Sequence, residues 1–474
     1  GKVMRKFYGA LVAGVVFFGC AHVENRAQLA QFSTAYYATQ HAQADKMSKD
    51  FISKDKKNRD TPLWNLENGV NAFMMGNYDS SVKTLDMANK TFDTNYKNME
   101  KGIAKAGAAT YGSAANIPYE GHMYEWTLTN YYMALDYMFL NKKQDARVEF
   151  NRTIERQRRI KDAYRKEIAK AQEQAEKAKS KNSNKFTSML AGTNQMDVEL
   201  KQTYSNLEKF KAYDGFINPM VSYVSGLFFC SNKDAKGLDD LKEAYGVSQN
   251  PVVAQDIKNF KHGSKEKFTW VIVEDGKQPT LKEYKIDAIN LALPLLVPGE
   301  DFHKSFQLVV ENKVQNLSVL SNFGAIVGKE YQTTLPTIKA RAITSAILKT
   351  GTEEGLKAAG QYAGGYGGLA ASIGGAAMHA ANKASTAADT RSSNIFPNIV
   401  YVGRIKNSEA NNFALNVDNN PSLHATFHMI TCDAEHGASL AHGAKDHQVC
   451  INTNNIIFVR SLPSSLNVKV LSLR

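Results

Sequence analysis

The first half of the chain carries apolar residues at the three- and four-residue intervals of amphipathic helices. Small and apolar residues recur at these intervals between Leu66 and Ala88, and the turn-forming residues 76–79 divide the stretch in two. Comparable stretches occupy residues 131–150 and 223–244, and Pro251 follows the last of them. Each stretch therefore predicts a pair of packed helices whose small residues allow a close approach.

The second half changes to stretches rich in β-branched and aromatic residues, which are typical of strands. Residues 268–274 are the clearest example, and Asp275 with Gly276 then predicts a turn before a second extended stretch. Further strands are expected at residues 305–310, 398–404, 412–417, 425–430, 455–459 and 468–471. One long helix is expected at about residues 335–349, with Pro336 in its first turn.

The order of small, apolar and turn residues in the helix pairs resembles that of tetratricopeptide repeats. The predicted fold class is therefore α+β, with a tetratricopeptide-like helical array over residues 61–262 and a mixed α/β, β-rich domain over residues 263–474. Stacked helix pairs form a concave surface that suits a peptide or a partner helix. A generic helical bundle with the same spacing is the alternative.

A long basic helical arm is predicted from Asn151 to about Lys181, between the second and third helix pairs. Residues 151–185 contain twelve basic and five acidic side chains, and the whole chain has a net charge of +12. Such a charge attracts polyanions, but a nucleic-acid surface also needs aromatic residues, and the arm has only Tyr164. We therefore expect a solvated helix with intrahelical ion pairs and no nucleic-acid partner.

The N-terminal residues have the pattern of a secretory signal. Arg5 and Lys6 precede an apolar run over residues 8–19, which is too short to span a bilayer and stops at Cys20. A small residue followed by cysteine resembles a bacterial lipobox, although Phe17 and Phe18 depart from its usual residues. We expect a signal peptide at residues 1–19, a lipid on Cys20 and a polar tether over residues 20–60.

Several blocks in the second half resemble an uncharacterised family of Gram-negative outer-membrane lipoproteins. The blocks are residues 271–276 with Pro279, Leu281 and Glu283; Glu330 with Leu335, Pro336, Arg341 and Ala342; and residues 388–391 with Phe396 and Pro397. Ser393 departs from the family, which has Trp there. The resemblance covers roughly residues 20–404 and implies an assembly partner instead of a substrate. Ala21, in place of Asp, is similar to the sorting signal for the outer membrane.

A histidine-rich segment near the C-terminus holds the candidate metal ligands. They are His424, His428, His436, His442 and His447. Imidazole binds zinc or copper, but this spacing matches no standard zinc module. Two alternatives remain open: a disulfide between Cys432 and Cys450 that closes a polar loop, or an exposed loop that is simply rich in histidine.

A Gly/Ala-rich stretch at residues 351–388 predicts either a mobile loop or a packed or membrane-contacting helix. The sequence contains none of the familiar catalytic motifs, so we expect no enzyme and no cofactor.

The sequence therefore predicts a lipid-anchored scaffold at the periplasmic face of the outer membrane, which binds one or more periplasmic or outer-membrane proteins. Self-association into an oligomer stays open. The alternatives are an activator of a cell-wall synthase and a metal-binding periplasmic protein.

Overall fold

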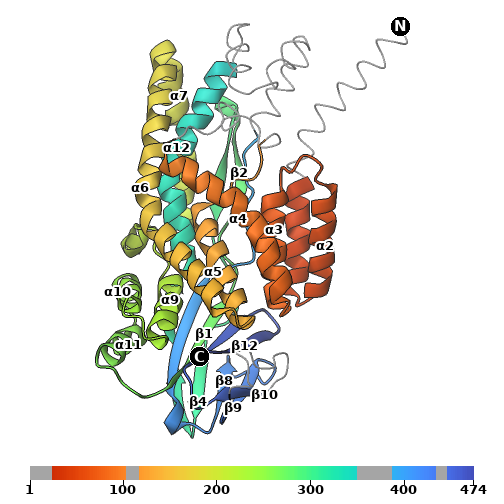
Figure 1. Ribbon diagram of the computed structural model, residues 1–474. Helices are drawn as coiled ribbons and strands as arrows, with labels where there is room; N and C mark the ends of the chain where they lie inside the picture. Colours follow the sequence, from red (N-terminus) through yellow and green to blue (C-terminus); the bar gives the residue numbers. More distant parts are fainter. Residues whose placement is uncertain (1–23, 103–116, 206, 350–386, 434–445) are drawn as a thin grey trace.

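The computed structural model of the protein describes residues 24–102, 117–205, 207–349, 387–433 and 446–474. The predicted signal peptide, Cys20, His436, His442 and most of the Gly/Ala-rich stretch lie outside the described residues. The fold class is α+β, as predicted: helices dominate the first half and three sheets occupy the second (Figure 1). Within the described residues, no helix is both long and apolar enough to cross a membrane.

The segment expected to be a tether is largely helical. Residues 24–37 form a helix, and α2 (His41–Lys54) follows it. Phe32 and Tyr36 are fully buried in the main core, and His41 Nδ1 lies 2.9 Å from Asn71 Oδ1. The tether prediction is wrong here because Phe32 and Tyr36, four residues apart, share one helix face, and that face packs into the array.

The three predicted helix pairs are present. They are α3 (Thr61–Met74) with α4 (Tyr78–Glu100), α5 (Met123–Phe139) with α6 (Lys143–Lys181), and α9 (Pro219–Ser231) with α10 (Gly237–Ser248). A Cβ atom added to Gly69 would lie 2.5 Å from Leu85 Cδ2, and one added to Gly226 would lie 2.6 Å from Leu241 Cδ2. Glycine is therefore required where the two helices of these pairs cross.

The predicted basic arm forms the greater part of α6, a helix of 39 residues. The helices that complete the first half are α7 (Ser183–Gly192), α8 (Asn194–Thr203), the short 3-10 helix η3 (Leu207–Tyr213) and α11 (Pro251–Lys261). The arm packs against α7 and against α12 (Phe323–Lys349) from the second half, so part of it is buried (Figure 1).

The strands form two five-stranded sheets and a separate hairpin. The first sheet has the order β12-β11-β1-β7-β6, with bounds Leu466–Ser472, Asn455–Ser461, Phe268–Asp275, Ile399–Lys406 and Ser318–Asn322. The second has the order β10-β9-β8-β4-β5, with bounds Asp446–Cys450, His424–Ile430, Asn412–Val417, Phe306–Val310 and Lys313–Asn316. The hairpin is β2 (Thr280–Ile286) with β3 (Leu291–Val297).

Strand β1 joins the two cores of the molecule. Trp270 and Ile272 belong to the core shared with the helices, whereas Val271 and Val273 belong to a second core shared with the second sheet. This division follows from the alternation of side chains along a strand. A hydrogen bond also links the helices to this strand, because Tyr132 Oη of α5 donates to Glu274 of β1 at 2.9 Å. The helical array and the first sheet therefore share one core.

Helix α12 begins twelve residues earlier than predicted, at Phe323, and Pro336 lies in its interior. Asn322 supplies the start signal, because its Oδ1 accepts a 3.0 Å hydrogen bond from the backbone N–H of Ala325. The placement of Pro336 in a first turn is therefore wrong. The extra turns lengthen the face that α12 presents to the hairpin and to α6.

Candidate functional site

The described histidines of the C-terminal segment do not converge. His424 and His428 lie on the same face of β9, while His447 on the neighbouring strand β10 is buried and stacks on Phe427, with ring centroids 5.3 Å apart. In the parts of the chain that the structure describes, no three His, Cys, Asp or Glu residues are grouped so as to hold a metal ion.

The structure joins Cys432 and Cys450 in a disulfide, the pairing that the sequence suggested. The two Cα atoms lie 5.3 Å apart, and the bond connects the chain just after β9 to the end of β10. Cys230, the free cysteine among the described residues, lies on α9 against Gly237. The disulfide therefore closes residues 432–450, which include His447, into a covalent loop.

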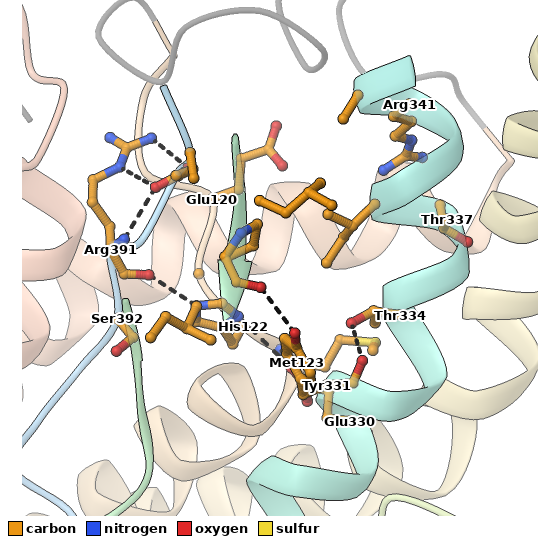
Figure 2. Close-up of a pocket in the computed structure, with 18 of the residues that line it drawn as sticks. Glu120, His122, Met123, Glu330, Tyr331, Thr334, Thr337, Arg341, Arg391 and Ser392 are labelled. Atoms are coloured by element: carbon orange, nitrogen blue, oxygen red, sulfur yellow. Dashed lines mark hydrogen bonds and ion pairs between the residues drawn. The ribbon is translucent and has the colours of Figure 1, made fainter. Parts of the chain in front are cut away.

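Two hollows are better candidates. The first, which we call the α12 cavity, has a volume of about 290 Å³ and lies between α12, α6, the N-terminus of α5, the β2–β3 hairpin and residues 387–392 (Figure 2). The second, the α4–α6 groove, has a volume of about 730 Å³ and lies on the helical array.

One wall of the α12 cavity is a single face of α12. Its members recur every three or four residues: Val327, Glu330, Tyr331, Thr334, Thr337, Ile338, Arg341, Ala342, Ser345 and Ala346. The hairpin supplies the opposite wall with Leu281, Leu291, Leu293 and Pro294. Tyr331 Oη donates a 2.9 Å hydrogen bond to the carbonyl of Pro294 and so fixes the two walls to each other.

The inner end of the cavity is built around the buried carboxylate of Glu330. Its oxygens accept hydrogen bonds from the backbone N–H groups of Met123, at 3.1 Å, and Tyr124, at 2.8 Å. These N–H groups open α5 and have no partner within the helix, so a carboxylate there satisfies them and interacts favourably with the helix dipole. Burial nevertheless raises the pKa of Glu330 to about 7.

His122 lies beside this carboxylate. Its Nδ1 is 3.9 Å from Glu330 Oε2, and its Nε2 is 2.9 Å from the carbonyl oxygen of Arg391. Burial opposes the charged form of His122, but the carboxylates of Glu125 and Glu330 outweigh that effect and raise its pKa. The polar atoms at the inner end are therefore already engaged by the protein.

Paired charges surround the outer end. Arg341 of α12 forms a 2.9 Å ion pair with Glu167 of α6. Arg391 lies across the cavity from Arg341 (Figure 2). It forms ion pairs with Asp389 and Asp60, each at 3.0 Å. The side chain of Asp389 is 47% exposed, so this end meets solvent. The cavity thus combines apolar walls with a charged mouth.

Residues from all three family-like blocks meet at this cavity. Pro279 and Leu281 come from the first block, Glu330, Arg341 and Ala342 from the second, and Ala388, Asp389 and Arg391 from the third. The sequence alone does not predict the cavity itself. The order of these blocks was the available signal, but nothing in the sequence alone showed that α12 would extend far enough to bring them together.

The α4–α6 groove is strongly charged. It is lined by Asp86, Asn89, Lys90, Asp93, Tyr96, Lys97, Glu100, Lys101, Arg152, Glu155, Arg156 and Arg159. Arg156 is buried at its base, where it donates to Asp93 and Asn130, and its guanidinium lies 5.1 Å from the ring centroid of Tyr96. Lys90 and Arg159 are 76% and 60% exposed, so their charges can meet a partner.

No protein-family model, curated protein or solved structure matches this chain in comparisons of its sequence and fold.

Proposed function

We propose that the protein is a non-enzymatic scaffold, anchored by a lipid on Cys20 at the periplasmic face of the outer membrane, that holds a protein partner in the α4–α6 groove. The observation that carries this proposal is a wide charged groove on an array of helix pairs. Helical arrays of this kind present extended surfaces to peptides and partner helices. The apolar run that stops at Cys20 supports the anchor.

The charges of the groove favour an acidic partner segment. Six of its lining side chains are basic and four are acidic, which leaves a surplus of two positive charges. Arg156 holds the base of the groove rigid, while Arg152 and Arg159 stand at the rim with 56% and 60% of their side chains exposed. Rim charges of this kind steer association and exclude partners of like charge.

Charge reversal at the rim tests the proposal. A photoreactive amino acid at Lys90, in intact cells, should crosslink a defined partner, and Arg152→Glu with Arg159→Glu should reduce that product by about tenfold. Lys177→Glu is the matched control, because Lys177 is an exposed residue of the same helix outside the groove. Equal crosslinking by the double variant and the control would contradict the proposal.

The anchor is tested separately. Mass spectrometry of native protein should find a diacylglyceryl group on Cys20, and Cys20→Ser should release the chain from the membrane fraction. An unmodified thiol at this position in membrane-bound protein would refute the anchor while leaving the groove proposal to its own test.

A further inference from the structure

The α12 cavity is long and narrow. Its lining residues on α12 run from Val327 to Ala346, which is about 28 Å at a helical rise of roughly 1.5 Å per residue. Its volume is only about 290 Å³, near the lower limit of small-ligand pockets. A small volume drawn out along five helical turns fits an extended chain better than a ring system or a folded peptide.

The walls along that length are largely apolar. Leu281, Leu291 and Leu293 of the hairpin face the α12 residues Ile338 and Ala342 across the cavity. The polar atoms of Glu330 and His122 at the inner end already bond to backbone groups, as described above, so they require nothing from a ligand. The interior therefore offers apolar contact without demanding a polar partner.

The mouth differs from the interior in charge. The ion pairs of Arg341 with Glu167 and of Arg391 with Asp389 lie there, and the Asp389 side chain, which is 47% exposed, brings this end into contact with solvent. Figure 2 shows Arg341 and Arg391 on opposite sides of the cavity. Because the mouth carries ion pairs of both signs, it suits a polar headgroup in water without selecting its charge. An apolar interior below a polar mouth is the arrangement that an amphiphile with one chain requires.

We propose that the α12 cavity binds a single linear acyl chain, with the chain along α12 and the headgroup at the mouth between Arg341 and Arg391. This site is separate from the α4–α6 groove and does not depend on the scaffold role proposed above. The chain supplies the binding free energy, since each buried methylene strengthens binding by about fourfold.

Titration calorimetry tests the proposal. Saturated fatty acids of eight to sixteen carbons are titrated into the full-length protein at concentrations below their critical micelle concentrations. The dissociation constant should fall by about fourfold for each added methylene and then level off once the chain fills the cavity. Lysophosphatidylcholines with the same chains form the second arm. Binding in both arms assigns recognition to the chain, and binding in one arm identifies the headgroup that the mouth accepts.

A matched pair of variants locates the site. Ala342→Phe places a ring in the cavity and should weaken binding of tetradecanoate by at least tenfold, whereas Ala340→Phe, on the same helix but outside the lining, should leave it unchanged. Ala346→Phe, one helical turn beyond Ala342, gives an independent block at the mouth, and thermal melting of all three variants verifies that they fold. The proposal would be overturned if the affinity did not depend on chain length, or if Ala342→Phe and Ala340→Phe bound tetradecanoate equally well. Preferential binding of apolar peptides would also overturn it.

Discussion

At the scale of single residues, Glu330 forms hydrogen bonds that hold α5 in place, but burial disfavours its charged form. Its carboxylate satisfies two N–H groups at the start of α5, yet it is buried, and its pKa rises to about 7. A carboxyl whose pKa is higher in the folded state than in the unfolded state favours folding when it is protonated. The stability of the protein should therefore fall as pH rises from the unfolded value of about 4.5 towards 7.

Glu330→Gln should make the free energy of unfolding depend less on pH. The shift of the Glu330 pKa corresponds to at most about 3 kcal/mol of unfolding free energy between pH 5 and pH 8. His122 acts in the same direction, because its raised pKa gives stability at low pH that is lost as pH rises through that value. Urea denaturation at both pH values measures the effect. Glu155→Gln, an exposed carboxyl of α6, is the control, and an equal pH slope in wild type and Glu330→Gln would contradict the argument.

At the scale of elements, the helix pairs depend on glycine at their crossings. Gly226 of α9 faces Leu241 of α10, and a Cβ there would also lie 3.0 Å from the carbonyl oxygen of Gly237. By contrast, a Cβ on Gly246, near the end of α10, would meet nothing within 4 Å. Replacement of glycine by alanine should therefore have opposite effects on stability at Gly226 and Gly246.

Gly226→Ala should destabilise the protein by about 1–3 kcal/mol, because the added methyl forces α9 and α10 apart. Gly246→Ala should stabilise it by up to about 1 kcal/mol through helix propensity alone. Chemical denaturation of both variants makes the comparison, and two changes of the same sign would show that the helix crossing does not set the requirement.

These elements also show how far the sequence could predict the structure. The helix pairs and six of the later strands follow from local spacing, and the structure confirms them. Strands β3, β5, β6 and β10 were missed. Lys313 and Ser318 lie on short, partly exposed strands whose pairing is set by other parts of the chain, and the apolar run of β3 contains Pro294, a residue that disfavours a strand. The α12 cavity could not be predicted, since it requires α12, α6 and the hairpin to meet from sites far apart in sequence.

At the scale of the whole molecule, the predicted boundary near residue 262 does not divide the core. Trp270 Nε1 donates a 3.0 Å hydrogen bond to Asp256 of α11, and Arg404 forms a 2.8 Å ion pair with the same carboxylate. The three tryptophans, Trp64, Trp126 and Trp270, belong to one continuous core that spans helices and sheet. The two halves should therefore unfold together.

A fragment of residues 24–262 should lack a cooperative thermal transition, because it exposes the core surface that β1 covers. The full chain should show one transition, with the same midpoint by tryptophan fluorescence and by far-ultraviolet circular dichroism. A fragment that melts cooperatively, or two separate transitions in the full chain, would show instead that the halves are independent domains.

The parallel pairing of β1 with β11 has a consequence for biogenesis. The two strands are joined in register from Thr269 with Asn455 to Asp275 with Ser461, so the centre of the first sheet needs a segment that lies 186 residues after β1. Contacts so distant in sequence form slowly, because a long loop must close first. A chain that emerges from a ribosome N-terminus first cannot complete the centre of this sheet until residues 455–461 have emerged. Apolar surface that stays uncovered during that interval favours aggregation, which is the hazard that chaperones reduce.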